Sequence, residues 1–406
     1  MKYLILVGDG MGDLPIADLD HRTPLDFAAT PMLDSLCKKG QLFLTRTVPE
    51  GFPPGSDVAN LSLLGYKPEE YYTGRAPLEA ASMGIDLAPD ETAFRCNLVT
   101  LNHQGDGKVQ MIDYSAGHIS SEESGQLIEA LEAECATEQF HFKAGISYRH
   151  ILVVKGDYPA MNPLPPHDYI EKDVSGPWRR YMEKPEWQEL FNKANTILAN
   201  HPVNQRRAAN GQNEANGIWL WGEGKLPSMP TLHERFGIKG SLISAVDLLK
   251  GLGVMAGLDV LNIPGATGYI DTNYKGKADA ALECLKTQDF VFVHVEGPDE
   301  AGHQGLMQDK LQAIKDFDAK IVAPIVQGLQ DRGEEFRLIA TMDHYTPLSL
   351  RTHTDTPVPT ILYDSREQEK GSGECFSEKT GNEAGKKKDG LLPDGETMIK
   401  QLLQRD

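Results

Sequence analysis

Three apolar stretches of this chain each lead into an aspartate, and this pattern constrains the fold more than any other feature. The stretches KYLILV, FVFVHV and FRLIAT have the length and the β-prone side chains of buried strands. Asp9, Asp299 and Asp343 follow them after a short loop. Sites in α/β sheets lie at the carboxyl ends of the strands, so we expect the three carboxylates at one edge of a single sheet.

Helical patterns alternate with these strands. Residues 30–40 have a proline at the first helical position, apolar residues at helical spacing and a closing glycine, which predicts a helix. Residues 241–253 predict an amphipathic helix that ends at a glycine, and residues 310–329 predict a long helix kinked at Pro324. Alternating strands and helices are typical of an α/β fold.

The middle of the chain differs in character. Short strand-like runs, a helical pattern at residues 120–134 and Pro-rich loops predict a second α/β domain inserted at residues 85–234. The first domain would then be discontinuous and comprise residues 1–84 and 235–406, and 406 residues suffice for two domains. Residues 371–390 are polar and Gly-rich, which predicts a mobile loop.

The charge balance limits the possible partners. The chain has 40 Lys and Arg against 59 Asp and Glu, a formal net charge of -19, which disfavours nucleic acid and anionic membranes as partners. The five cysteines are scattered, which disfavours a disulfide framework or a cysteine zinc site. The apolar run at the N-terminus is too short for a signal peptide or a membrane span. These features predict a cytoplasmic protein.

Histidines accompany two of the three aspartates. His303 lies four residues after Asp299, His344 directly follows Asp343, and His353 comes nine residues later. Each has an ordinary alternative, because an aspartate after a strand often caps a helix and an acid–histidine pair can form a surface turn. The convergence of the whole set favours a divalent metal site. Carboxylate and imidazole ligands without cysteine suit Mn, Zn, Co or Fe better than Ca.

Two nucleotide-binding motifs are absent. The glycines of GDGMGD lack the G-x-G-x-x-G spacing of dinucleotide-binding folds, and no P-loop sequence occurs in the chain. The sequence therefore disfavours both a dinucleotide-dependent enzyme and a P-loop kinase.

Ser56 is the candidate nucleophile. It follows Pro-Pro-Gly and begins an apolar helical pattern that ends at Gly65. A serine in this position is commonly a helix cap. The same position also suits a nucleophile, because a helix N-terminus stabilises an alkoxide or a phosphate, and a nearby metal lowers the pKa of a serine. Ser62 is a weaker candidate because it lies in the helix interior.

Several longer motifs carry a resemblance to a known family. GDGMGD, PPGSDVANLSLLGY, YTGRAPLEAASMGIDL, GPDEAGHQG and DHYTPLSLRTHTDTPVP, together with SAGHIS, SYRHILVV and NEANGIWLWGEG, run nearly end to end. In this order they resemble the cofactor-independent (2,3-bisphosphoglycerate-independent) phosphoglycerate mutases of the archaeal-type branch, members of the alkaline phosphatase-like superfamily. The resemblance implies an alkaline phosphatase-like α/β/α sandwich domain that binds metal, interrupted by a smaller α/β domain that binds substrate.

The resemblance also implies a chemistry. It is an intramolecular phosphoryl transfer of glycolysis and gluconeogenesis, in which Ser56 takes the phosphate of 3-phosphoglycerate and returns it to the 2-hydroxyl. Two divalent ions, Mn, Zn or Co with Mg possible, take part, without 2,3-bisphosphoglycerate or nucleotide. By motif, one ion is held by Asp9, Ser56, Asp343 and His344, and the other by Asp299, His303 and His353.

The resemblance implies substrate-binding cations as well, namely His118, Arg149, Arg207 and Lys239. The expected partner is a small phosphorylated carboxylate. One position departs from the family pattern, because Asn60 stands where a histidine is usual, and an amide cannot act as an acid or base. This leaves open whether the phosphate acceptor is glycerate, homoserine as in a homoserine kinase-like transferase, or water as in a phosphatase.

Overall fold

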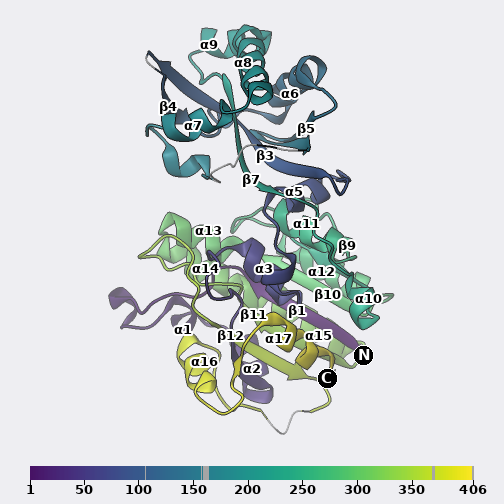
Figure 1. Ribbon diagram of the computed structural model, residues 1–406. Coiled ribbons are helices and arrows are strands. Elements are labelled where there is room, and N and C mark those ends of the chain that lie inside the picture. The colour runs from purple at the N-terminus through teal and green to yellow at the C-terminus, as the bar shows by residue number, and fades with distance from the viewer. Residues whose placement is uncertain (106, 157, 159–163, 368–370, 405–406) are drawn as a thin grey trace. The chain divides into compact units, whose positions relative to one another are not determined.

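The chain forms two compact units. The computed structural model describes residues 1–105, 107–156, 158, 164–367 and 371–404. The main unit comprises Met1–Tyr72 and Ser228–Asp406, and the inserted unit comprises Thr73–Pro227 (Figure 1). Each unit has its own apolar core.

The boundaries of the inserted unit differ from the predicted 85–234. The first crossing lies at residue 72 rather than 84 because the helix α5 (Ala76–Ser82) packs against strands of the inserted unit. Ala76 and Ala80 share an apolar cluster with Ile151, which lies on one of those strands. The second crossing lies near residue 228 rather than 235, so α10 (Leu232–Phe236) belongs to the main unit.

The main unit is built on an eight-stranded sheet with the order β13-β2-β12-β11-β1-β10-β8-β9. β1 (Lys2–Gly8) lies parallel to β10 (Phe290–Val295) on one side and to β11 (Phe336–Thr341) on the other. The loops after these three neighbouring strands therefore emerge at one edge, as the sequence predicted. The remaining strands are β8 (Gly240–Ile243), β9 (Asp259–Val260), β12 (Val358–Asp364), β2 (Gln41–Thr45) and β13 (Leu391–Leu392).

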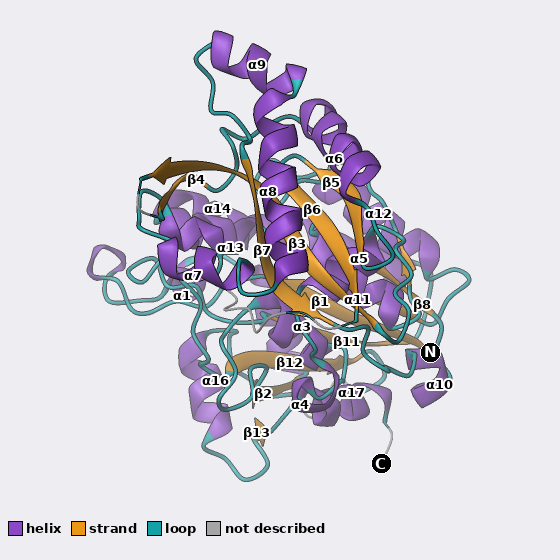
Figure 2. Ribbon diagram, turned by 45° about the horizontal axis from the view of Figure 1, so that its top comes forward, coloured by secondary structure: helices purple, strands orange, loops and turns teal. Residues whose placement is uncertain are grey.

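Helices cover both faces of this sheet (Figure 2). Leu4 and Leu6 of β1 face one layer, and Ile5 and Val7 face the other because successive side chains of a strand alternate. The first layer contains α2 (Pro31–Lys39), α12 (Tyr274–Cys284), α14 (Met307–Phe317) and α15 (Ala323–Asp331), and the second contains α3 (Ser56–Leu63), α11 (Asp247–Met255) and α17 (Gly395–Leu403). The predicted α/β/α sandwich is confirmed.

Shorter elements complete the main unit at its loops. They are η1 (Ala17–Leu19), α1 (Pro24–Phe27), α4 (Pro68–Tyr71), α10, α13 (Gly297–Gln304), η3 (Asp318–Val322) and α16 (Glu378–Gly385). The π-helical turn η3 ends at Val322, two residues before Pro324, and separates α14 from α15, so the predicted long helix is interrupted there, whereas the kink itself stays a prediction.

Two local predictions are wrong. The helix predicted at residues 241–253 begins only at Asp247, because Gly240–Ile243 form strand β8, which pairs with β10. The loop predicted to be mobile at residues 371–390 contains α16, whose first turn is capped by Ser377. Glu378 of α16 is buried and accepts hydrogen bonds from the Asp13 backbone N–H at 3.1 Å and from Thr23. These long-range bonds order a segment whose composition is polar.

The inserted unit contains a five-stranded sheet with the order β4-β3-β6-β5, in which β7 also pairs with β3. Its strands are β3 (Glu91–Gln104), β4 (Lys108–Asp113), β5 (Phe140–Ile146), β6 (Arg149–Lys155) and β7 (Gly217–Gly224). Its helices are α5, α6 (Ser121–Cys135), η2 (Pro166–Tyr169), α7 (Ser175–Tyr181), α8 (Pro185–Asn200) and α9 (Pro202–Ala209). Trp187, Phe191 and Trp219 are almost fully buried in its core, so aromatic packing contributes to the stability of the unit.

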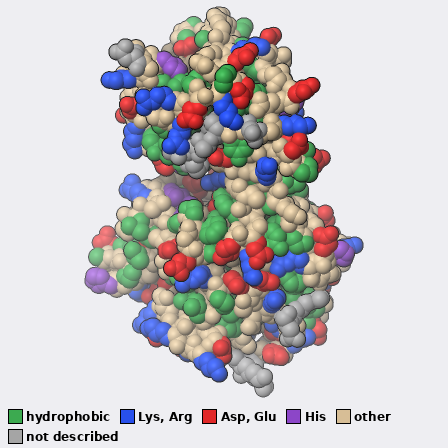
Figure 3. Space-filling view, viewed as in Figure 1, with side chains coloured by type: hydrophobic (Ala, Val, Ile, Leu, Met, Phe, Trp, Pro, Cys, Tyr) green, Lys and Arg blue, Asp and Glu red, His purple; other side chains and the backbone are tan. Residues whose placement is uncertain are grey.

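The surface shows no concentration of one charge sign on the visible face. Acidic and basic side chains are interspersed there (Figure 3). Among the described residues, no helix combines the length and the apolar character that crossing a bilayer requires.

Candidate active site

The three aspartates predicted to meet do so at the carboxyl edge of the main sheet. Asp9, Asp299 and Asp343 are buried, with at most 7% of each residue exposed. Gly10 lies between them with φ of +59°, and its N–H donates to Asp343 Oδ1 at 3.1 Å. A Cβ atom on Gly10 would lie 2.5 Å from Asp299 Oδ1, so only glycine allows the loop after β1 to approach this closely.

One group of possible metal ligands contains Asp9, Asp343 and His294, whose ligand atoms lie within 4.8 Å of one another. His294 was not predicted from the sequence. It lies in β10 and is fully buried, with Nε2 3.2 Å from Asp9 Oδ2. The signal that could have found it is a histidine inside the otherwise apolar stretch FVFVHV.

A second group contains Asp299, His344 and His353. His303 joins it, because its Nε2 atom lies 3.3 Å from Asp299 Oδ2 and 2.8 Å from His353 Nε2. His344 Nε2 also lies 3.5 Å from Asp9 Oδ1 and 3.4 Å from Asp343 Oδ2. His344 is therefore within reach of both groups, and its assignment to the ion of Asp9 and Asp343 stays a prediction.

Ser56 lies beside these groups. It is the first residue of α3, and its Oγ atom is 3.1 Å from His344 Nε2. Gly55 occupies the N-cap, and in the described structure no side chain caps this helix, so the capping alternative for Ser56 is wrong. Ser62 is buried, and its Oγ accepts a hydrogen bond from the Gly395 N–H at 3.2 Å, which indicates a structural role.

Asn60 connects Ser56 to a carboxylate. Its Nδ2 group donates to Asp343 Oδ2 at 2.8 Å and to the Ser56 carbonyl oxygen at 2.9 Å. The side chain is fully buried. Both amide hydrogens are thus used to hold Ser56 and Asp343 in place, and this role requires no acid or base chemistry.

The electrostatics of the site fit a bound divalent cation. Burial, together with the neighbouring Asp343 and Asp299 carboxylates, raises the pKa of Asp9 well above its ordinary value. Asp9 Oδ1 and His294 Nε2 are buried and have no hydrogen-bond partner among the described residues. Buried acids that repel one another and polar atoms without partners are costly unless a cation sits among them. The residues present therefore suit a metal ion by the chemistry of their donors.

The second group is charged differently. The hydrogen bond that the His303 ring donates to the Asp299 carboxylate raises the pKa of His303 to about 9. Burial alone would raise the pKa of Asp299, but its hydrogen bonds with His303 and His353 hold it well below the ordinary value. Asp299 is thus an anion surrounded by imidazoles, an arrangement in which a divalent ion would replace bound protons.

Lys310, which was not predicted as a site residue, contacts both the loop after β1 and the loop after β11. It is fully buried, and its ammonium donates to the carbonyl oxygens of Gly12 at 3.1 Å and Thr346 at 2.7 Å and to Asp13 Oδ2 at 2.8 Å. Thr346 in turn donates to Asp299. The loop after β1 and the loop after β11 are therefore tied to one buried charge on α14.

In the inserted unit, two predicted cations lie on one aromatic group. The rings of His118 and Tyr148 are 6.2 Å apart, and the Arg149 guanidinium lies 5.9 Å from the Tyr148 ring. His118 and Arg149 are exposed. Arg95 stacks on the Trp221 ring at 3.8 Å. Burial lowers the pKa of Arg95, and the neighbouring positive charge of Arg149 adds to this effect.

The other two predicted cations are placed differently. Arg207 is buried, and its guanidinium donates to Glu123 at 2.6 Å and to the carbonyl oxygens of Ala116 at 2.6 Å and Asn213 at 2.8 Å. It braces the loop before α6, and its direct contact with substrate stays a prediction. Lys239 precedes β8 at the amino end of the sheet, where its carbonyl accepts from Asp289 N–H at 2.9 Å. The candidate site lies at the carboxyl end, so the fold does not bring Lys239 to it, and its role in substrate binding stays a prediction.

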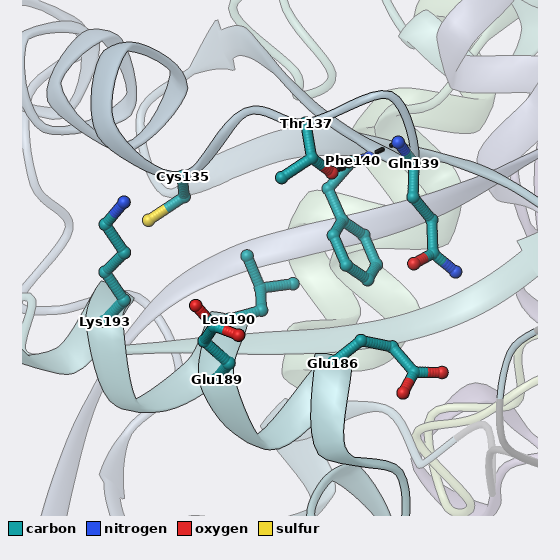
Figure 4. Close-up of a pocket in the computed structure, with 8 residues that line it drawn as sticks. All are labelled: Cys135, Thr137, Gln139, Phe140, Glu186, Glu189, Leu190 and Lys193. Carbon is teal, nitrogen blue, oxygen red and sulfur yellow. Dashed lines mark hydrogen bonds between the residues drawn. The ribbon is translucent and has the colours of Figure 1, made fainter.

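A cavity of about 190 Å³ in the inserted unit offers no competing site. It is lined by residues of α6, β5, α8 and the loop after α6 (Figure 4). Burial raises the pKa of the Cys135 thiol, which keeps it protonated and unreactive near neutral pH. None of the predicted site residues lines this cavity.

The fold and the site define a class of protein, the α/β sandwich proteins in which a serine at a helix start lies beside acid–histidine groups that could hold metal ions. Residues 37–204 match the family model of 2,3-bisphosphoglycerate-independent phosphoglycerate mutase. The chain is 48% identical to a probable enzyme of that name from Geobacter sulfurreducens, over 100% of both chains. It is 50% identical to one from Methanosarcina acetivorans, over 94% of this chain and 95% of the relative.

Solved structures agree. A protein from Pyrococcus horikoshii superimposes with a TM-score of 0.80 at 29% identity, covering 100% of this chain and 98% of the other. The cofactor-independent phosphoglycerate mutase of Thermoplasma acidophilum gives a TM-score of 0.65 at 29% identity, covering 100% and 99%. The chain belongs to the 2,3-bisphosphoglycerate-independent phosphoglycerate mutase family, which confirms the resemblance seen in its sequence.

Proposed function

We propose that the protein interconverts 3-phosphoglycerate and 2-phosphoglycerate through a phosphoserine at Ser56. The observation that carries this proposal is the position of Ser56, at the start of α3 and 3.1 Å from His344 among the candidate metal ligands. Free backbone N–H groups at a helix start favour an anionic oxygen or a phosphate. Full-length similarity to relatives that bear the enzyme's name supports the same reaction.

Seven residues would hold two divalent ions. Their carboxylate and imidazole donors favour Mn, Zn or Co, with Mg possible. When bound, such ions neutralise negative charge on the phosphoryl oxygens and favour the ionised form of the serine. The predicted ligands are Asp9, Ser56, Asp343 and His344 for one ion, and Asp299, His303 and His353 for the other.

The residues of the chain supply orientation. Ser56 Oγ accepts the phosphoryl group from one hydroxyl of glycerate and returns it to the other, so no phosphate is consumed or released. Asn60 fixes the Ser56 backbone and the Asp343 carboxylate relative to each other through its two hydrogen bonds. Lys310 fixes the loops that carry Asp9 and Asp343. Such preorganisation is what phosphoryl transfer demands of a protein.

The inserted unit would recognise the anionic groups of the substrate. In a chain of net charge -19, a phosphorylated carboxylate requires local positive charge. His118 and Arg149 provide it on exposed side chains, whereas Arg95 is buried and paired with Glu79. Arg207 acts indirectly, by bracing the loop that contains His118.

The alternatives raised by Asn60 find no support in the site. An amide in this position positions two neighbours and leaves the transfer between Ser56 and substrate intact. The presence of Asn60 is therefore no argument for homoserine or water as the phosphate acceptor. A cytoplasmic location stays a prediction.

One experiment tests the proposal. Purified protein with 3-phosphoglycerate labelled in its phosphate should return the label in 2-phosphoglycerate, with little free phosphate. Free phosphate as the main product would identify a phosphatase. Label that moves only after homoserine is added would identify the transferase. Either result would overturn the mutase assignment.

A further inference from the structure

We propose that His294 is an additional ligand of the metal ion held by Asp9 and Asp343, and that Glu296 and Lys277 orient it for this role. This inference rests on the metal requirement in the proposed function. It adds a residue that the motifs of the sequence did not suggest, because His294 lies inside strand β10 rather than in a loop.

The position of the imidazole is the first argument. His294 is fully buried and lies opposite Val7 of β1, two residues before Asp9. Its Nε2 atom is 3.2 Å from Asp9 Oδ2 and 3.9 Å from Asp343 Oδ2. Despite these distances, Nε2 makes no hydrogen bond to any described residue. The ring nitrogen and both carboxylates thus converge on a common space, as metal ligands do.

The opposite side of the ring is the second argument. His294 Nδ1 lies 3.1 Å from Glu296 Oε1, which also accepts from Ser244 Oγ at 2.7 Å and from the Ala245 N–H at 3.0 Å. A carboxylate that is already an acceptor requires the proton on Nδ1. The lone pair then lies on Nε2, which faces Asp9 and Asp343.

Lys277 completes the arrangement. Its ammonium is fully buried and lies 3.0 Å from Glu296 Oε2 and 3.0 Å from the His294 carbonyl oxygen. It keeps Glu296 ionised and fixed. A carboxylate that holds the far nitrogen of a histidine is the usual way in which proteins orient an imidazole toward a metal.

A competing explanation is a purely structural ion pair between an imidazolium and Asp9. Such a pair is present, because Nε2 lies 3.2 Å from Asp9 Oδ2, although Nε2 makes no hydrogen bond to a described residue, so distance alone does not separate the two explanations. The two explanations also differ in what is lost on substitution: an ion pair contributes only to stability, whereas a ligand contributes to metal affinity.

The test compares two substitutions of His294, each of which replaces one of the two ring nitrogens with a polar atom in a similar position. Asn places its amide near Nδ1 and retains the contact with Glu296, whereas Gln places a polar atom near Nε2. His150 provides the matched control, since it is also a buried strand histidine whose Nε2 has no described partner, but it lies in the inserted unit. Affinity for Mn²⁺ and Co²⁺ would be measured by equilibrium dialysis with elemental analysis.

We expect His294→Asn to lower the affinity for one of the two ions by about 100-fold or more. Glu296→Gln should lower the same affinity by about 10–100-fold. His294→Gln should retain more affinity than His294→Asn. The visible spectrum of the Co²⁺ form should change in His294→Asn and stay unchanged in His150→Asn. Melting temperatures of the metal-free proteins separate folding defects from lost ligation.

Three outcomes decide the matter. Selective loss of one ion in His294→Asn supports the inference. Two ions bound with wild-type affinity and an unchanged Co²⁺ spectrum overturn it and leave the proposed function standing. Wild-type protein that binds no divalent ion at all overturns the proposed function itself.

Discussion

The two units handle charge in opposite ways. In the main unit the site charges are buried and fixed from several sides, as Asp343 is by Gly10 and Asn60. In the inserted unit the candidate substrate-binding cations, His118 and Arg149, are exposed and rest on aromatic rings. Chemistry that develops charge needs groups already held in place, whereas recognition of an anion tolerates side chains that adjust. We therefore expect substitutions in the main unit to affect turnover and folding, and those in the inserted unit to affect binding.

The largest expected effect follows from removing the hydroxyl group of Ser56. Ser56→Ala should lower turnover by about 10⁵-fold or more, because no other group accepts the phosphoryl group. Bound metal, measured by elemental analysis, should largely remain. Ser62→Ala in the same helix is the control, and it should keep turnover while the unpaired Gly395 N–H costs about 1–3 kcal/mol in the free energy of unfolding. Wild-type turnover in Ser56→Ala would show that the nucleophile lies elsewhere.

Loss of the buried lysine should come next. Lys310→Met leaves Asp13 buried without its partner and should cost about 3–5 kcal/mol in the free energy of unfolding, measured by urea denaturation. Lys310→Met combined with Asp13→Asn should recover part of this loss, because the uncompensated charge is gone. A single variant as stable as wild type would show that the main unit does not depend on this buried pair.

A buried acid of the main unit should make stability depend on pH. Burial raises the pKa of Glu378 to about 7, so the folded protein holds this proton more tightly than the unfolded chain does. Its contribution is present below the unfolded pKa and is lost as pH rises through 7, by up to about 3 kcal/mol. Denaturation curves between pH 5 and 8 should show this loss, and Glu378→Gln should remove it. An identical pH profile in both proteins would contradict the assignment.

The smallest effect belongs to the inserted unit. Arg149→Ala should raise KM by about 10–100-fold with a smaller change in kcat, since one charge-assisted bond to substrate is worth about 1.5–3 kcal/mol. Arg179→Ala, which removes another exposed arginine of the same unit, should leave KM unchanged. A fall in kcat with unchanged KM in Arg149→Ala would mean that this cation acts in the phosphoryl-transfer step. The distinction between a main unit for turnover and an inserted unit for binding would then be wrong.

Much of this protein was determined by local sequence. β1, β10 and β11 were predictable from short apolar runs, and Asp9, Asp299 and Asp343 from their places after those runs. Parallel neighbours bring such positions to one edge, so periodicity and chain order were sufficient. Ser56 was predictable as a helix start, but its two possible roles were not separable by sequence.

Only the tertiary structure decided the rest. His294 and Lys310 look like ordinary members of an apolar strand and a helix, and their roles depend on partners that lie far away in the chain, such as Asp9 and Gly12. Lys239 satisfies a motif yet lies at the wrong end of its strand for the site. A sequence records which groups are available, whereas burial and distance between remote segments decide which of them meet. For a charged group buried among others, those two quantities determine its chemistry.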